Sequence, residues 1–195
     1  MSPRTILIIT VVLIFGYVIS LYNFFQSART RIKASIQEIG NQLKRQADLI
    51  PNLESSVKGY LKHEKGILDN LADARKKIAS AVKSGSLEKQ AEAAGMLSQV
   101  IPSLSVAVED NPELKGSDTV NRLMEELRDT SDKVMYARRT LIDLSADYNI
   151  KLATFPSNLV GSLFGFKEEA GLKVGDMSGV TSVSGAETKS PKINL

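Results

Sequence analysis

The sequence contains no cysteine, no tryptophan and only one histidine, His63. The absence of cysteine excludes disulfide bonds, thiolate nucleophiles and cysteine-bound zinc. His63 is surrounded by Lys62, Glu64 and Lys65, which offer charge partners but neither a second metal ligand one helical turn away nor a nucleophile. We therefore expect a histidine at the surface or at the edge of the bundle, and an enzyme that uses His63 with Glu64 is the least favoured hypothesis.

The sequence also lacks the motifs of common enzyme classes. It contains no P-loop, no G-x-G-x-x-G and no G-x-S-x-G motif. Glu125 with Glu126, or Asp69 with Asp73, could form paired carboxylates, but the Glu-x-x-His motifs of di-metal helical bundles are missing. The chain is therefore predicted not to be an enzyme, with no catalytic residues, no cofactor, no cofactor-binding residues and no metal ligands.

Aromatic residues make up only 6% of the chain, whereas 43% is hydrophobic and 24% is charged. This composition is typical of long helices rather than of a β-sandwich or barrel. The formal net charge is only +3, and basic residues are interspersed with acidic ones. Because nucleic-acid binding needs clustered basic residues, we expect no nucleic-acid partner.

One long hydrophobic run lies near the N-terminus. Residues 6–25 (ILIITVVLIFGYVISLYNFF) carry no charge, and fourteen of these twenty residues are Ile, Leu, Val or Phe. About 20 such residues cross a hydrocarbon core. The run is longer than the ~7–15 apolar residues of a signal peptide, and no A-x-A-like cleavage site follows it. It predicts one uncleaved membrane anchor, with the lipid bilayer as partner.

Basic residues are unequally distributed around this run. Arg4 and the α-amino group precede it, and five basic residues follow it: Arg29, Arg31, Lys33, Lys44 and Arg45. Positively charged flanks stay on the cytoplasmic side of a membrane. We expect the C-terminal domain to be cytoplasmic.

Beyond the anchor, apolar residues recur at alternating spacings of four and three, which indicates helices with one apolar face. The first series is Ile32, Ile36, Ile39, Leu43, Gln46, Ile50, Leu53, Val57, Tyr60, Glu64, Ile67, Leu71, Ala74 and Ile78; another is Leu123, Leu127, Thr130, Val134, Ala137, Leu141, Leu144 and Tyr148. Coiled coils and antiparallel bundles share this period. The predicted fold class is all-α, with a single N-terminal transmembrane helix that continues into an antiparallel helical bundle of long helices.

Pro51 interrupts the first series and disfavours helical geometry at Ile50. We expect one helix from the membrane to about Ile50 and a second from Pro51 to about Lys83. A kink is the favoured geometry at Pro51, because the turn residues that a tight reversal needs are absent there.

Capping residues predict the remaining boundaries. Gly85 marks a helix end, and Ser86 is a natural N-cap for a third helix, which Pro102 should bend. Residues 109–116 (EDNPELKG) are predicted to form a loop. Ser117 then caps a fourth helix that should reach about Thr154 before Pro156.

The C-terminal part differs from the bundle in composition. Residues 157–166 (SNLVGSLFGF) are strongly apolar, and they either dock on the end of the bundle or contact the membrane or a partner. From about Lys173 the sequence has no periodicity and is predicted to be disordered. The predicted organisation is an N-terminal tail and transmembrane helix (1–28), a helical bundle (29–155), an apolar segment (156–172) and a disordered tail (173–195).

Several short motifs resemble those of the LemA family of bacterial membrane proteins, in the family's order over about residues 3–172. They are Tyr22-Asn23, residues 42–53 (QLKRQADLIPNL), residues 57–60 (VKGY), His63-Glu64, Ala74-Arg75, residues 111–115 (NPELK), Leu123 with Glu126-Leu127, Ala137-Arg138, Tyr148-Asn149, residues 155–158 (FPSN) and Gly165-Phe166. The DLIPNL stretch followed by VKGY and HE is highly specific.

This resemblance implies a short N-terminal tail, one membrane helix, a helical-bundle domain and a place in the bacterial inner membrane. It implies no established enzymatic activity, although some relatives are associated with membrane remodelling or specialised membrane compartments. Residues 138–142 (RRTLI) depart from the family's usual aromatic and Asn pair after the Arg, and residues 130–132 (TSD) replace a more typical acidic stretch. If this helix recognises a partner, the departures predict a different one.

Two functional hypotheses follow. The first is a membrane-anchored structural or interaction scaffold that recruits protein partners or forms a homo-oligomer. The alternative is a membrane-linked regulatory or sensory module that transmits a change through the helix at Pro51.

Overall fold

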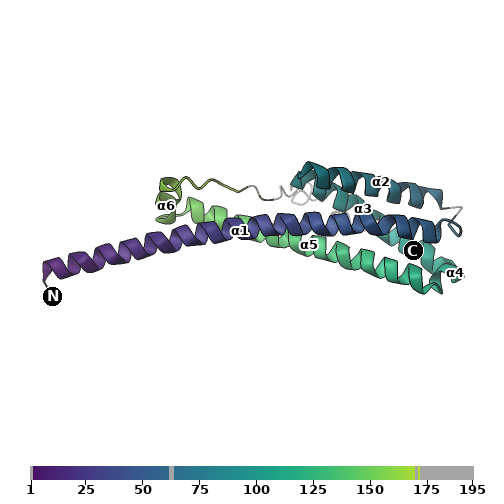
Figure 1. Ribbon diagram of the computed structural model, residues 1–195, viewed down its shortest axis with the longest axis horizontal. Helices are drawn as coiled ribbons and strands as arrows, with labels where there is room; N and C mark the ends of the chain where they lie inside the picture. Colours follow the sequence, from purple (N-terminus) through teal and green to yellow (C-terminus); the bar gives the residue numbers. More distant parts are fainter. Residues whose placement is uncertain (1, 62–63, 170, 172–195) are drawn as a thin grey trace, which may run out of the picture.

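The computed structural model describes residues 2–61, 64–169 and 171, and this part of the chain is helical, without β-strands (Figure 1). The helices are α1 (Pro3–Val57), α2 (Lys65–Ser84), α3 (Leu87–Asp110), α4 (Pro112–Lys115), α5 (Asp118–Ala153) and α6 (Ser157–Leu163). The all-α prediction is confirmed. His63 and the predicted disordered tail, residues 173–195, lie outside the described residues.

α1 and α5 form the long axis of the molecule and run in opposite directions (Figure 1). Near one end Gln46 of α1 contacts Ser131 of α5, and nearer the N-terminus Phe25 of α1 contacts Tyr148 of α5. As residue numbers fall along α1 they rise along α5, so the pair is antiparallel. The apolar faces predicted for both helices meet here, because Leu43, Ile50, Leu127 and Leu141 are all fully buried.

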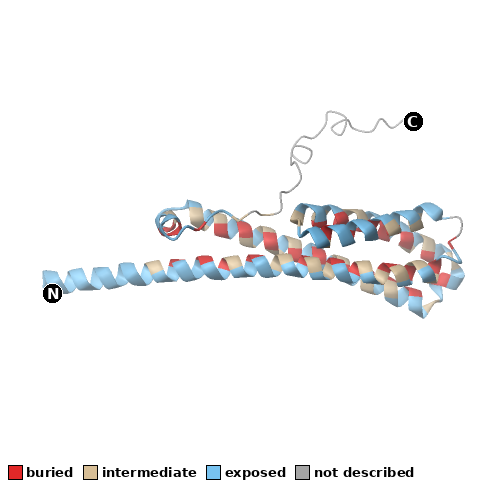
Figure 2. Cartoon of the chain, turned by 45° about the horizontal axis from the view of Figure 1, so that its top comes forward, coloured by how far each residue is buried: buried red, intermediate tan, exposed pale blue. Residues whose placement is uncertain are grey.

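α2 and α3 form a second antiparallel pair, which covers only the half of α1 that is distant from the N-terminus (Figures 1 and 2). Lys77 Nζ and Glu92 Oε1 lie 3.1 Å apart across this pair. The buried side chains of α2 and α3 join those of α1 and α5 in one core, and Leu71, Ile78, Leu97 and Leu104 are fully buried there. The four longest helices therefore pack together in the half of the molecule that is distant from the N-terminus.

Pro51 does not end a helix, so the prediction of a helix that starts there is wrong. α1 continues through Pro51 to Val57, and α2 begins only at Lys65. The chain leaves α1 after Val57, whose carbonyl accepts two backbone hydrogen bonds from the following turn. A proline removes one helical hydrogen bond, but burial of Leu53 and its neighbours against the core stabilises the helix beyond it.

Residues 109–116 are not a simple loop either, contrary to the prediction. α3 continues to Asp110, and the short helix α4 follows at once. The Asn111 side chain accepts hydrogen bonds from the backbone N–H groups of Glu113 and Leu114, and Pro112 occupies the first helical position, where no N–H is needed. Burial of Leu114 fixes this turn against the bundle.

The other predicted boundaries are confirmed. Gly85 ends α2 in the left-handed conformation at φ +66°, and Ser86 caps α3 by accepting a hydrogen bond from the Lys89 N–H. Ser117 caps α5 by accepting one from the Val120 N–H, and α5 ends at Ala153. Short polar side chains placed before apolar runs thus set these helix starts.

Candidate functional site

The first part of α1 extends beyond the rest of the molecule (Figure 2). Residues 3–17, here called the projecting segment, are all exposed, and its apolar side chains include Phe15 at 67% exposure. α1 has the length and composition of a membrane-spanning helix, and almost none of its most apolar stretch is buried. α3 also has a suitable length and composition, but nearly half of its apolar stretch is buried in the bundle.

An aromatic cluster surrounds α1 just after the projecting segment. Phe25 is completely buried, with its ring centroid 5.5 Å from that of Tyr148 and 4.9 Å from that of Phe166. Tyr22 lies edge-on to Phe164, with ring centroids 5.0 Å apart. Such edge-to-face pairs are favourable beyond the area that they bury. Because these rings come from α1, α5 and the segment after α6, the cluster joins three parts of the chain.

The segment that follows α6, residues 164–169, runs back over the bundle, and we call it the strap. Its last residue, Glu169, accepts a hydrogen bond at 2.7 Å from Arg29 Nε of α1. The Asn149 side chain of α5 donates to the Glu169 carbonyl at 2.9 Å and accepts from the Glu169 N–H at 3.0 Å. These two hydrogen bonds pair the backbone N–H and C=O groups of Glu169 with α5. Together with Arg29 they hold the strap against both long helices.

α6 has an inner and an outer face. Val160 and Gly161 are buried against the bundle, where a Cβ added to Gly161 would lie only 2.5 Å from the Leu152 side chain. Ser157 Oγ donates to the Lys151 carbonyl at 2.6 Å. The apolar segment predicted at residues 157–166 therefore docks on the bundle end through one face. Its opposite face stays exposed at Leu159 and Leu163.

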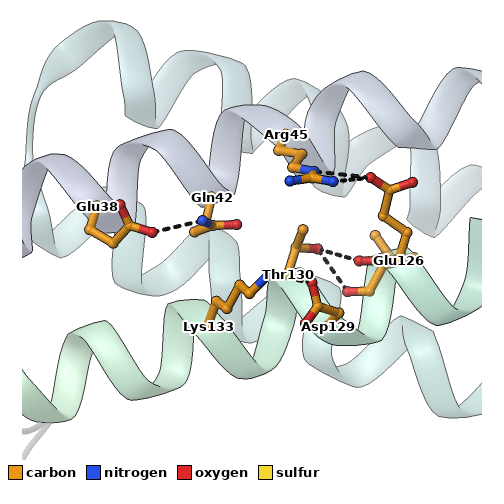
Figure 3. Close-up of polar contacts among 8 residues, drawn as sticks. Glu38, Gln42, Arg45, Glu126, Asp129, Thr130 and Lys133 are labelled. Atoms are coloured by element: carbon orange, nitrogen blue, oxygen red, sulfur yellow. Dashed lines mark hydrogen bonds and ion pairs between the residues drawn. The ribbon is translucent and has the colours of Figure 1, made fainter.

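A line of polar contacts runs between α1 and α5 on the side of the bundle (Figure 3). Arg45 Nε donates to Glu126 Oε1 at 3.0 Å, and its Nη2 donates to the same oxygen. This hydrogen bond raises the pKa of Arg45 above its ordinary value. Beside it, Gln46 Nε2 donates to Ser131 Oγ at 2.8 Å from a nearly fully buried position. These contacts set the register of α5 against α1.

Two side chains of this polar line stay within their own helix. The Thr130 hydroxyl donates back to the carbonyls of Glu126 and Leu127, at 3.0 and 2.9 Å (Figure 3). Lys133 pairs with Asp129 one turn earlier, at 2.7 Å. Such pairs are stabilising elements of a helix surface rather than reactive groups.

The carboxylate pairs considered from the sequence do not form a site. Glu126 is occupied by Arg45, and Asp73 pairs with Lys76 at 3.3 Å on an exposed turn of α2. Within residues 2–61, 64–169 and 171, no three His, Cys, Asp or Glu side chains lie close enough together to hold a metal ion. Glu126 and Asp73 are therefore used in ion pairs on the bundle surface.

The aromatic cluster and the strap were missed by sequence reasoning. The aromatic residues at the end of the hydrophobic run, including Tyr22 and Phe25, were a usable signal, because aromatic side chains gather where an apolar helix meets a polar surface. The Arg29–Glu169 pair had no sequence signal, since 140 residues separate its partners. Only the antiparallel return of α5 brings them together.

Comparison with known protein families shows to which family the helical bundle belongs. A model described as the LemA family matches residues 35–184. The matched range includes the C-terminal part of α1 and all of α2 to α6, and it begins after the projecting segment. No curated protein matches the chain.

Proposed function

Because the chain belongs to the LemA family, we propose that it is a single-pass membrane protein whose helical bundle is a scaffold beside the bilayer. The observation that carries this proposal is the projecting segment, which leaves large apolar side chains such as Leu13 and Phe15 exposed, at 68% and 67%. A run of this kind is costly in water and favourable in hydrocarbon. We place the span at residues 6–25.

The scaffold role is supported by the continuity of α1. About 32 residues separate Phe25 from Val57 within this one helix, and at 1.5 Å per residue they reach roughly 48 Å from the bilayer. α5 runs beside α1 over most of this length and stiffens it. A bundle of this kind holds a bound protein at a set height above the membrane.

The surface that we assign to partner proteins or to a second copy is the outer side of α5. Met135 and Tyr136 are exposed there, Tyr136 at 73%, and Arg139 lies one turn further along. Exposed Tyr, Met and Arg side chains are enriched at protein interfaces. Arg139 also belongs to the stretch that departs from the family pattern, which supports a partner particular to this member.

Membrane anchoring is tested by placing charges in the span. Leu13→Arg with Phe15→Arg adds about 5–7 kcal/mol to insertion, at about 2.5–3.5 kcal/mol for each arginine. We expect this variant to leave the membrane fraction, whereas Leu13→Phe stays in it. Retention of the double-arginine variant after alkaline extraction would contradict a span.

Partner binding is tested with a photo-crosslinking amino acid at position 136, in cells and in the full-length chain. We expect discrete crosslinked species there and none from the same amino acid at Lys76, which is exposed on α2. Native mass spectrometry of the detergent-solubilised protein then gives the stoichiometry. A strictly monomeric protein without crosslinks at position 136 would refute the scaffold.

We further propose that the bundle lies on the cytoplasmic side of a bacterial inner membrane, in accordance with the basic residues that follow the span. The chain has no cysteine, so Tyr60→Cys creates a single thiol in the turn after α1. A membrane-impermeant thiol reagent should label it only after cells are permeabilised. Labelling in intact cells would reverse the orientation.

A further inference from the structure

The outer face of α6 and the residues next to it form a small apolar surface at the base of the projecting segment. Four large side chains are exposed there: Phe155 at 79%, Leu159 at 62%, Leu163 at 77% and Phe164 at 48%. Leu159 and Leu163 are four residues apart and so lie on one side of α6. The rest of α6 is used for docking, so this surface is not needed for the core.

Because this surface lies beside α1 at Tyr22 and Phe25, we propose that it enters the interfacial layer of the bilayer and forms a second membrane contact next to the span. The inference depends on the proposed span. If the hydrocarbon core begins at Ile6, twenty residues at 1.5 Å each bring its other boundary to Phe25. Tyr22 and Phe25 are the residues of α1 that contact Phe164 and Phe166, so α6 lies at this boundary.

The surroundings of α6 have the chemistry of a bilayer interface. Lys151 Nζ lies 5.9 Å from the centre of the Phe24 ring, and Lys167 is an exposed residue of the strap. Lysine side chains at such a boundary extend their charge toward headgroups while their methylene groups cover apolar surface. Tyr22 adds an aromatic hydroxyl, which accepts a hydrogen bond from Gln26 at 3.1 Å.

The strap and the docking contacts hold α6 at a defined height. Arg29 and Asn149 bind Glu169 from two helices, and Ser157 binds the Lys151 carbonyl. α6 therefore cannot move along α1 without breaking partly buried polar contacts. A single span can rotate and tilt in a bilayer, whereas a rigid lateral contact fixes both its depth and its rotation.

A bilayer is favoured over a soluble partner because the apolar surface is continuous. The exposed face of α6 lies beside α1 at Tyr22, whose ring contacts Phe164, and the exposed projecting segment ends only five residues before Tyr22 along the same helix. A lipid interface covers them together, as it does for amphipathic helices that lie in the plane of a membrane. A second copy of the chain is the competing occupant.

The test uses the absence of tryptophan from the chain. Leu163→Trp provides a single fluorophore on α6, and the full-length variant is reconstituted in phosphatidylcholine vesicles with bromine atoms at defined acyl-chain depths. We expect blue-shifted emission and stronger quenching by shallow than by deep bromines. Phe15→Trp, near the centre of the span, should be quenched most by deep bromines. Tyr136→Trp on α5 should not be quenched.

The outcomes distinguish the two proposals. Absence of quenching for Phe15→Trp overturns the span and with it this inference. Deep quenching for Phe15→Trp together with red-shifted, unquenched Leu163→Trp leaves the span and overturns the α6 contact. Blue-shifted but unquenched emission from Leu163→Trp also overturns it, because protein then covers α6.

A second experiment removes the apolar face of α6. In a Phe164→Trp background, Leu159→Glu with Leu163→Glu should abolish shallow quenching while the circular dichroism spectrum stays unchanged. Persistent quenching would contradict the contact.

Discussion

Tyr148 is a fully buried side chain at the junction of α5 with the base of the projecting segment. Burial raises the pKa of its phenol above 10, while the nearby Arg29 lowers it and Glu169 raises it by smaller amounts. Its hydroxyl has no hydrogen-bond partner among the described residues. The ring therefore contributes mainly through packing against Phe25.

This burial predicts a loss of stability at alkaline pH. The unfolded chain releases the Tyr148 proton near pH 10, whereas the folded chain keeps it to higher pH, so the free energy of unfolding falls as pH rises above 10. Tyr148→Phe should unfold at nearly the same temperature as the wild type at neutral pH and should lose less stability above pH 10. Thermal unfolding across this pH range measures the effect.

Tyr136→Phe is the matched control, because Tyr136 is an exposed tyrosine on the same helix. It should show the same pH dependence as the wild type. A Tyr148→Phe variant that parallels the wild type would refute the contribution of the buried phenol.

Two neighbouring residues of α1 separate apolar packing from ion pairing. Leu43 is fully buried, and Leu43→Ala should lower the free energy of unfolding by about 2–5 kcal/mol. Arg45 forms an ion pair with Glu126, but both side chains are substantially exposed, so Arg45→Ala should cost less than about 1 kcal/mol and less still in high salt. Denaturant titration of the full chain in detergent compares them, and equal losses would contradict this assignment.

At the scale of elements, the α2–α3 hairpin depends on the end of α2. Gly85 adopts φ +66°, where a side chain is strained, whereas Gly95 lies inside α3, where an added Cβ would meet no atom of a neighbouring side chain within 4 Å. Gly85→Ala should destabilise by about 1 kcal/mol, and Gly95→Ala should stabilise by about 0.5–1 kcal/mol. Thermal melts of both variants test the sign. If both substitutions shifted the melting temperature in the same direction, backbone conformation would not determine the effect of alanine at these positions.

α1 contains Pro51 within a continuous helix, although proline costs about 3 kcal/mol in a helix interior. Pro51→Ala should restore the missing hydrogen bond and raise the free energy of unfolding by up to that amount. Urea denaturation measures the change. A decrease in stability would mean that the bundle is packed around the local geometry of the proline.

At the scale of the whole molecule, α1 connects the proposed span to the far end of the bundle as one helix. Ser27 lies just after the proposed span, and Tyr60 lies in the turn beyond Val57. Energy transfer to a fluorescent lipid should be strong from a dye at Ser27→Cys and weak from one at Tyr60→Cys, because about 45 Å of helix separates Ser27 from the end of α1 at Val57. Equal transfer would show that the bundle lies flat on the bilayer.

Much of this protein follows from local patterns. The uncharged run at residues 6–25 determined the apolar helix, and the four-and-three spacing determined the faces of α1 and α5 that are buried, including Leu43, Leu127 and Tyr148. Ser86, Ser117 and Gly85 determined helix boundaries, because their capping contacts involve only residues nearby in sequence. The family prediction, made from short motifs, is confirmed by the match over residues 35–184.

Tertiary structure alone decided where the chain reverses and what meets at the base of α1. α1 passes through Pro51 because the packing of Leu53 and Val57 outweighs the cost of proline in a helix. The local sequence pattern does not reveal this packing, because it depends on the other helices. The contact of Phe25 with Tyr148 and Phe166, and the Arg29–Glu169 pair, exist because α5 returns along α1. Such contacts depend on residues more than a hundred positions apart, so they are determined by how the helices pack rather than by the periodicity of any one of them.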